Sequence, residues 1–164
     1  MNPYVLDSNF FIQAHRANYP FDVVPSFWSK IKDLADRGLI ISIDKVKEEI
    51  YRNDDELSSW CQKELPSNFF RDSSIAISEY ATLVKWANSR NDHFQPRAIE
   101  GFLATDSADA WIIAFAMNHK YPVLTHEKSE PERKNKIKMP DVCLYHGVSY
   151  CTTVEMLRNL KETI

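Results

Sequence analysis

Carboxylates stand beside apolar runs at two places where the sequence predicts buried strands. Asp7 follows the run Tyr4–Leu6, and Glu127 comes two residues after the run VLT. A carboxylate at the edge of a core is costly unless it is paired, neutralised or bound to a metal ion. The two acids are therefore candidates for chemistry, provided that other elements supply partners.

Two predicted helices carry further acids. Glu48 and Glu49 lie on the helix after the second predicted strand, and Asp106 and Asp109 lie at the start of a strongly apolar helix. Each acid also has a plain structural explanation. One of the two glutamates can be solvated, Asp106 is most simply the N-cap of its helix, and Asp109 then favours the helix dipole. Asp7 can end its strand in an Asx-turn. Only the set, one carboxylate from each of four elements at one sheet edge, indicates a site.

Such a cluster needs a counter-charge, because like charges destabilise one another and raise one another's pKa. Mg²⁺ is suited to this, since it prefers oxygen ligands and is held by a few carboxylates with waters and substrate phosphates. Two such ions, about 3.5–4 Å apart, can activate a water and stabilise the leaving oxygen of a phosphodiester. Histidine and cysteine, which zinc favours, are absent from these positions. The acids therefore predict a site for a hard divalent cation.

The composition excludes several other functions. Three isolated glycines, Gly38, Gly101 and Gly147, leave no glycine-rich phosphate loop. The net charge of −3 argues against simple binding to a nucleic-acid backbone, although an enzyme that gathers acids into a cleft can carry a local basic rim. We interpret the one dense basic stretch, residues 128–138, as a solvated loop.

The cysteines and the N-terminus indicate the compartment. Three cysteines without CxxC spacing favour a reducing environment, and the chain starts with neither a basic region nor a long apolar one. No apolar run reaches the length of a membrane span. We expect a cytoplasmic protein without membrane contact, folded as a single domain over residues 1–164.

Strands that alternate with helices predict an α/β domain, a three-layer α/β/α fold with a largely parallel central sheet. The site of such a sheet lies beyond the carboxyl ends of its strands, where the unusual acids fall. We expect Gly38 to end the first long helix, Pro96 to open a short one, and Thr152 or Thr153 to cap the last. The expected strands are 3–12, 39–43, 121–125 and one within 141–148, and the expected helices are 26–38, 45–52, 55–65, 74–90, 97–103, 106–120 and 152–163.

The chain resembles PIN-domain proteins along nearly its whole length. Four motifs carry the resemblance in order: YVLDSNFFI at 4–12, VKEEI at 46–50, ADAWIIAFA at 108–116 and YPVLTHE at 121–127. The chain is most similar to the small PIN-like toxin ribonucleases of bacterial toxin–antitoxin pairs. Its segment KIKMPDVCLYHGV is similar to a PIN-like subgroup of poorly assigned function.

The resemblance assigns roles to individual residues. It places the catalytic, metal-binding acids at Asp7, Glu49, Asp109 and Glu127, so that Glu48 becomes a neighbour. Family members often carry an aspartate in or just past the loop after the fourth motif's threonine, and this chain has Glu127 there. This difference bears on the binding of a second metal ion more than on that of the first. The resemblance also implies supporting polar residues at Ser8, Asn9, Asp106 and Thr125, with Asp141 as the alternative fourth acid.

The resemblance further implies an endoribonuclease that depends on Mg²⁺ or Mn²⁺, in which a metal-bound water attacks an RNA phosphodiester. A protein antitoxin and a homodimer are the implied partners. The alternative is a non-catalytic PIN-like module that binds RNA or a protein, because a fold alone does not give a function. A phosphatase or receiver-type domain fits less well, since Asn9 stands where the phosphatase pattern needs a second aspartate.

Overall fold

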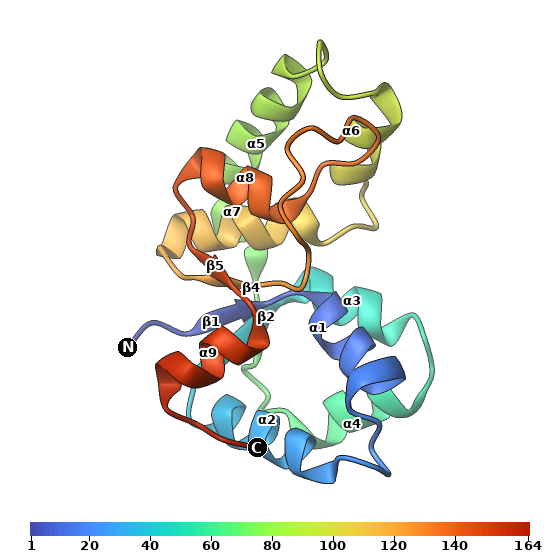
Figure 1. The fold of residues 1–164 in the computed structure, drawn as a ribbon, viewed down its shortest axis with the longest axis vertical. Coiled ribbons are helices and arrows are strands. Elements are labelled where there is room, and N and C mark those ends of the chain that lie inside the picture. The colour runs from blue at the N-terminus through green and yellow to red at the C-terminus, as the bar shows by residue number, and fades with distance from the viewer.

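A parallel sheet of five short strands runs through the centre of the molecule, in a computed structural model that describes all 164 residues (Figure 1). All four strand pairs are parallel. The α/β class and the largely parallel sheet that the sequence predicts are therefore confirmed. The strand order is β3-β2-β1-β4-β5, with β1 Tyr4–Leu6, β2 Ile40–Ile43, β3 Phe70–Arg71, β4 Val123–Leu124 and β5 Tyr150–Cys151.

The strand order explains why helices cover both faces of the sheet. The chain moves outward from β1 to β3, then returns to β4 and β5 on the other side of β1. Because crossovers between parallel strands are almost always right-handed, this reversal sends the later helices to the opposite face. In Figure 1, α5 to α8 lie above the sheet, and α1 to α4 lie below it with α9. The helices are α1 Ser8–Gln13, α2 Pro25–Asp36, α3 Asp44–Tyr51, α4 Glu56–Glu64, α5 Ile77–Ser89, α6 Pro96–Phe102, α7 Asp109–His119, α8 Met139–His146 and α9 Thr153–Leu160, with a π-helical segment at Ala14–Asn18 and a 3₁₀ turn at Ser73–Ala76.

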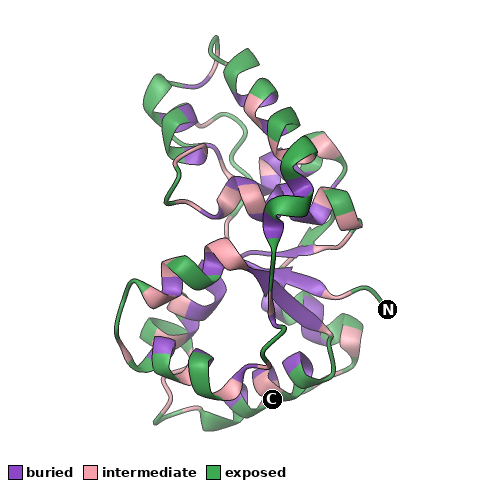
Figure 2. Cartoon of the chain, turned by 180° about the vertical axis from the view of Figure 1, so that it is seen from behind, coloured by how far each residue is buried: buried purple, intermediate pink, exposed green.

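Buried apolar residues occupy both faces of the inner strands, which appear almost wholly purple in Figure 2. Helix α7 contacts β1 and β4, and six of its eleven residues are buried. This confirms the expectation of a helix that is apolar on most faces. A strand covered on both sides has little room for charge, so polar side chains concentrate at its ends.

Three local signals in the sequence are confirmed. Gly38 has a φ of +70° directly after the C-cap of α2, a left-handed conformation that costs glycine little. Pro96 opens α6, and its missing N–H is not needed at a first helical position. Thr152, rather than Thr153, caps α9 and forms a capping box with Glu155.

The first predicted strand is too long. Pairing ends at Leu6, and the residues after Asp7 form α1, which buries Phe10 and Phe11. An apolar run gives no periodicity that separates a strand from a buried helix. The acid itself marks the boundary, because the Asp7 side chain accepts a hydrogen bond from the backbone N–H of Asn9 and so caps the helix.

Two predictions near the other motifs are wrong. Residues 141–148 do not contain a strand, because most of them belong to α8, which has Pro140 in its first turn and ends at Gly147 with a φ of +70°. Asp106 does not cap α7, which begins later, at Asp109, with Ala108 as its N-cap. The short strands β3 and β5 were not predicted, since two residues leave no alternation to detect.

No helix in the structure has both the length and the apolar character that crossing a membrane requires.

Candidate functional site

The acidic residues gather where the strand order reverses, between β1 and β4. Leu6 pairs with Leu124, so the next residue of each strand, Asp7 and Thr125, extends from the same carboxyl edge. The Thr125 hydroxyl donates to Asp7 Oδ2 at 3.0 Å. Asp7 is only 1% exposed, and Thr125 is equally buried. Ligand sites of open α/β sheets lie at this reversal.

Glu49 reaches the same edge from α3 and bridges two other elements. The Ser8 hydroxyl donates to one of its carboxylate oxygens. The backbone N–H of Ala108 donates to the other at 2.6 Å, directly before Asp109. The neighbouring Glu48 is exposed, so of the two glutamates only Glu49 faces these donors.

Asp109, the first residue of α7, is partly buried, and the structure shows no hydrogen bond to its carboxylate. Burial first, and then the charges of Asp7, Glu127 and Glu49, raise the pKa of Asp109 to about 8, against a lowering effect of Lys136. The charges of the other three acids therefore all act on the Asp109 carboxyl group.

The pKa of Asp7 is raised as well, to about 7. Burial is the main cause, and the charges of Glu127 and Glu49 add to it. The hydrogen bonds from Asn9 and Thr125 oppose the shift without cancelling it. Two carboxyl groups that give up their protons only near neutral pH indicate a site short of positive charge.

Glu127 joins the cluster from the loop after β4. The backbone N–H of Met139, the first residue of α8, donates to Glu127 Oε2 at 2.8 Å. The ammonium group of Lys136 lies 3.4 Å from Glu127 Oε1. Lys136 is therefore the lysine that faces the acids, and it belongs to the basic stretch that we interpreted as a solvated loop.

Three predicted supporting residues lie differently from Ser8 and Thr125. Asn9 approaches Asp7 through its backbone N–H. Asp141 binds the Ser129 hydroxyl and the backbone N–H of Glu130, so it holds the loop together outside the cluster. Asp106 is exposed, and only its backbone carbonyl has a partner, Arg52.

A divalent cation matches the chemistry of this oxygen-rich donor set. The side-chain geometry is less favourable, because no three histidine, cysteine, aspartate or glutamate side chains are arranged to hold a metal ion. Protein donors already engage the carboxylates of Asp7, Glu49 and Glu127, and Asp109 alone is free. Metal binding here would require these side chains to exchange protein donors for the cation.

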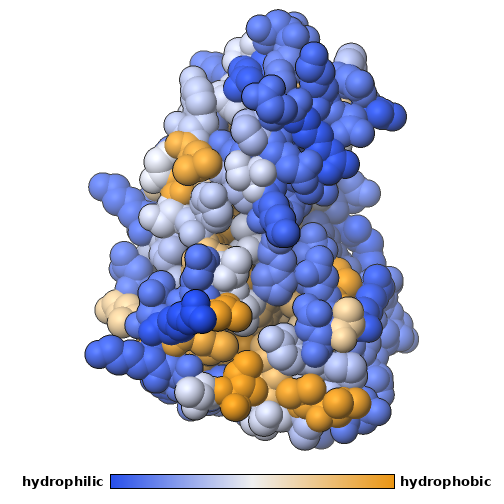
Figure 3. Space-filling view, in the orientation of Figure 1, coloured by the Kyte–Doolittle hydropathy of each residue, from blue (hydrophilic) through white to orange (hydrophobic).

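A basic hollow of about 290 Å³ adjoins the acids on the side of α6. Asp109 lines it together with Arg97, Arg133 and Lys136. Figure 3 shows the surface over α6 and the loop before α8, at the upper right, as hydrophilic. The net charge of the chain does not reveal this local basic rim. Its three cations come from two separate segments, α6 and the loop before α8.

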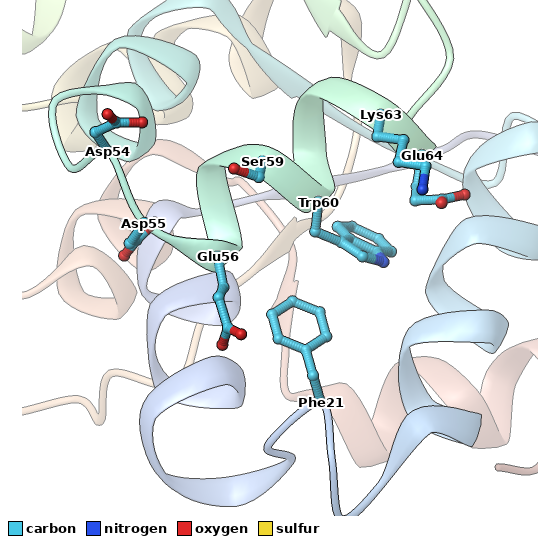
Figure 4. A pocket seen from close by; sticks show the side chains of 8 residues that line it. All are labelled: Phe21, Asp54, Asp55, Glu56, Ser59, Trp60, Lys63 and Glu64. Carbon is cyan, nitrogen blue, oxygen red and sulfur yellow. The ribbon is translucent and has the colours of Figure 1, made fainter.

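A second hollow, of about 470 Å³, lies beside α4, and none of the predicted site residues lines it. The rings of Phe21 and Trp60 face each other across it, with Glu56 and Lys63 on the same helix as Trp60 (Figure 4). Its charge is mainly acidic, with Lys63 as the one cation among the lining residues.

Comparison with known proteins gives a family of undetermined function. A family model described as "Domain of unknown function (DUF4411)" matches residues 4–164. No curated protein matches the sequence. A solved structure described as VapBC2 from Rickettsia felis bound to a DNA fragment from its promoter matches with a TM-score of 0.49 and 12% identity, over 91% of this chain and 97% of that one.

Proposed function

The chain belongs to the DUF4411 family, a domain family of unknown function, and we propose that this member is a metal-dependent endoribonuclease. The proposal rests on one observation. Carboxylates from four elements lie at the strand reversal, where burial and then the charges of Asp7, Glu127 and Glu49 raise the pKa of Asp109 to about 8. The Asp109 carboxylate has no protein partner, and Mg²⁺ or Mn²⁺ is the counter-ion that a set of oxygen donors favours.

Each acid has a role that follows from its position. The buried Asp7 and the partly buried Asp109 would hold the cation, and Glu49 and Glu127 would complete the donor set. When bound, the cation would lower the pKa of a water and stabilise charge on a phosphodiester. Ser8 and Thr125 orient Glu49 and Asp7 through their hydroxyl groups.

Calorimetric titration of Mn²⁺ into the full chain tests this proposal. We expect binding by the wild type and its loss in Asp109→Asn, which keeps the side-chain shape and removes the charge. Asp106→Asn is the matched control, because it removes an exposed aspartate three residues away and should bind Mn²⁺ like the wild type. A wild type that binds no Mn²⁺ would remove the mechanism.

One structural observation favours the alternative, a non-catalytic module that binds RNA or a protein. Both oxygens of Glu49, Asp7 and Glu127 already have protein partners, so three of the four acids are accommodated without a cation. The same titration separates the two functions. Cleavage of a single-stranded RNA that requires Mn²⁺ and is absent in Asp109→Asn would support the nuclease.

The motif resemblance extends the proposal to a cytoplasmic toxin that a protein antitoxin neutralises, with a homodimer as its assembly. Induced expression in bacteria tests this extension. We expect the wild type to arrest growth and Asp109→Asn, expressed at the same level, to leave growth unchanged. Equal growth arrest by both proteins would contradict a toxicity that depends on the acidic site.

A further inference from the structure

We propose that the basic hollow beside Asp109, lined by Arg97, Arg133 and Lys136, binds a backbone phosphate of a single-stranded nucleic acid next to the phosphate at the acidic site. This inference rests on the proposed function, because that function places the neighbouring phosphate at the acidic site. The hollow supplies what the acids cannot, because a carboxylate cluster repels a polyanion. The basic hollow and the acidic site would then contact neighbouring phosphates of one nucleic-acid strand.

The two arginines are held in place by neutral partners. Arg97 Nε donates to Gln95 Oε1 at 2.9 Å, and Arg133 Nε donates to Asn135 Oδ1 at 2.7 Å. Amide oxygens orient a guanidinium group without neutralising its charge. The one carboxylate that forms an ion pair with either arginine is Glu130, whose Oε2 lies 3.5 Å from Arg133 Nη1. Glu130 also contacts Lys138, at 3.6 Å. Both guanidinium groups can therefore still bind an anion through their remaining N–H donors.

The two segments that form the hollow are joined to each other. The backbone N–H of Gln95, just before α6, donates to the carbonyl of Lys134 in the loop at 2.8 Å. Buried Phe102 and Ile137 lie beneath the charged rim and pack in the core. The cations are thus set on a supported surface, and their spacing does not depend on a free loop.

Lys136 connects the hollow to the acids. Its ammonium group lies 3.4 Å from Glu127 Oε1, and Lys136 also lines the hollow with Arg97 and Arg133, so it stands between the positive and negative parts of the site. A nucleic-acid strand that lies across Lys136 would place one phosphate toward the arginines and the next toward the carboxylates. Because Lys136 touches a predicted metal-binding acid, it is unsuitable as a test of phosphate binding alone.

Fluorescence anisotropy of a labelled 12-nucleotide single-stranded RNA, in EDTA so that no divalent cation takes part, tests the hollow directly. We expect Arg97→Gln and Arg133→Gln each to weaken binding about tenfold, as the loss of a charge-assisted hydrogen bond would. The slope of log K against log salt concentration should fall by about 0.7 for each cation removed. Lys63→Gln, at the acidic hollow beside α4, is the matched control and should keep both the affinity and the slope of the wild type.

Three results would overturn the inference. The first is a wild type that binds no RNA. The second is a double variant, Arg97→Gln with Arg133→Gln, that binds the RNA with the affinity and salt slope of the Lys63→Gln variant. The third is displacement of the RNA by uridine monophosphate at an equal concentration of phosphate groups, which would make a free phosphate ester the ligand. Failure of the proposed function appears separately, as RNA that is bound through the arginines but is not cleaved when Mn²⁺ is added.

Discussion

Asp7 carries out two tasks with one carboxylate. It caps α1 through the backbone N–H of Asn9, and it contributes a buried charge to the acidic cluster, where Thr125 also binds it. The plain explanation, an aspartate at a turn, is therefore confirmed, and the functional one stays a prediction. Substitutions that differ in only one of these tasks can separate them.

We predict that Asp7→Asn and Asp7→Ala differ in stability although both remove the charge. Asparagine caps a helix about as well as aspartate, whereas alanine loses roughly 1 kcal/mol of capping. At pH 8, Asp7→Asn should unfold at the same or a higher denaturant concentration than the wild type, because a repelled buried charge disappears. Asp7→Ala should fall below Asp7→Asn by about 1 kcal/mol. Urea unfolding of the three proteins measures this, and equal stability of the two variants would argue against the capping role.

At the scale of elements, α8 decides how the cluster is completed. Its N-terminus supplies the N–H that holds Glu127, and the loop before it supplies Lys136. Its apolar residues, among them Val142 and Cys143, are buried beneath the surface that the loop covers. A strand at this place would remove the donor to Glu127 and move the loop away from the acids.

We predict that Gly147→Ala destabilises the protein by about 1–2 kcal/mol, because Gly147 ends α8 with a φ of +70°, a conformation that costs other residues about this much. No atom lies within 4 Å of a Cβ added there, so the cost is one of backbone conformation. Gly101→Ala is the control. It lies inside α6, also has open space, and should stabilise the helix by roughly 0.5–1 kcal/mol. Thermal unfolding of both variants should show shifts of opposite sign.

At the scale of the whole molecule, the acidic cluster opposes the folded state at neutral and higher pH. An aspartate in the unfolded chain gives up its proton near pH 3.8, whereas Asp7 and Asp109 in the folded chain keep theirs to about pH 7 and 8. Between these values the folded protein binds more protons, so its free energy of unfolding falls as the pH rises. The upper limit of this slope is about 1.4 kcal/mol per pH unit for each group.

We predict that, without divalent cations, the protein is more stable at pH 5 than at pH 8. Burial lowers the pKa of His126, so this residue makes the free energy of unfolding rise with pH. It is one group, whereas Asp7 and Asp109 are two groups that make the free energy of unfolding fall. Asp109→Asn should reduce the pH dependence and be more stable than the wild type at pH 8. Guanidinium unfolding at several pH values measures this. A wild type whose stability rises steadily from pH 5 to pH 8 would contradict the raised pKa values.

The same charge balance predicts a response to metal. A cation that binds only the folded state stabilises it in proportion to the logarithm of its concentration. Mn²⁺ should therefore raise the unfolding temperature of the wild type at pH 8 and leave that of Asp109→Asn unchanged. An equal rise in both proteins would indicate that the ion binds elsewhere.

The α/β class, most of the helices and the candidate acids could be predicted from the sequence. These features follow from local rules: apolar period, proline and glycine positions, caps such as Thr152, and the expense of a carboxylate beside a core. Each of these rules depends on only a few residues that are close together in the sequence. Two of the differences, the strands predicted where α1 and α8 form, lie in short apolar segments, in which periodicity does not separate a helix from a strand.

Which side chains lie close together depends on the tertiary structure. The Leu6–Leu124 register sets Asp7 beside Thr125, the fold of α3 turns Glu49 inward and Glu48 outward, and the loop before α8 carries Lys136 to Glu127. Arg97 and Arg133 lie 36 residues apart by number, yet line one hollow beside Asp109. Electrostatic interaction depends on distance through space, so neither the raised pKa values nor the basic rim could be derived from order along the chain.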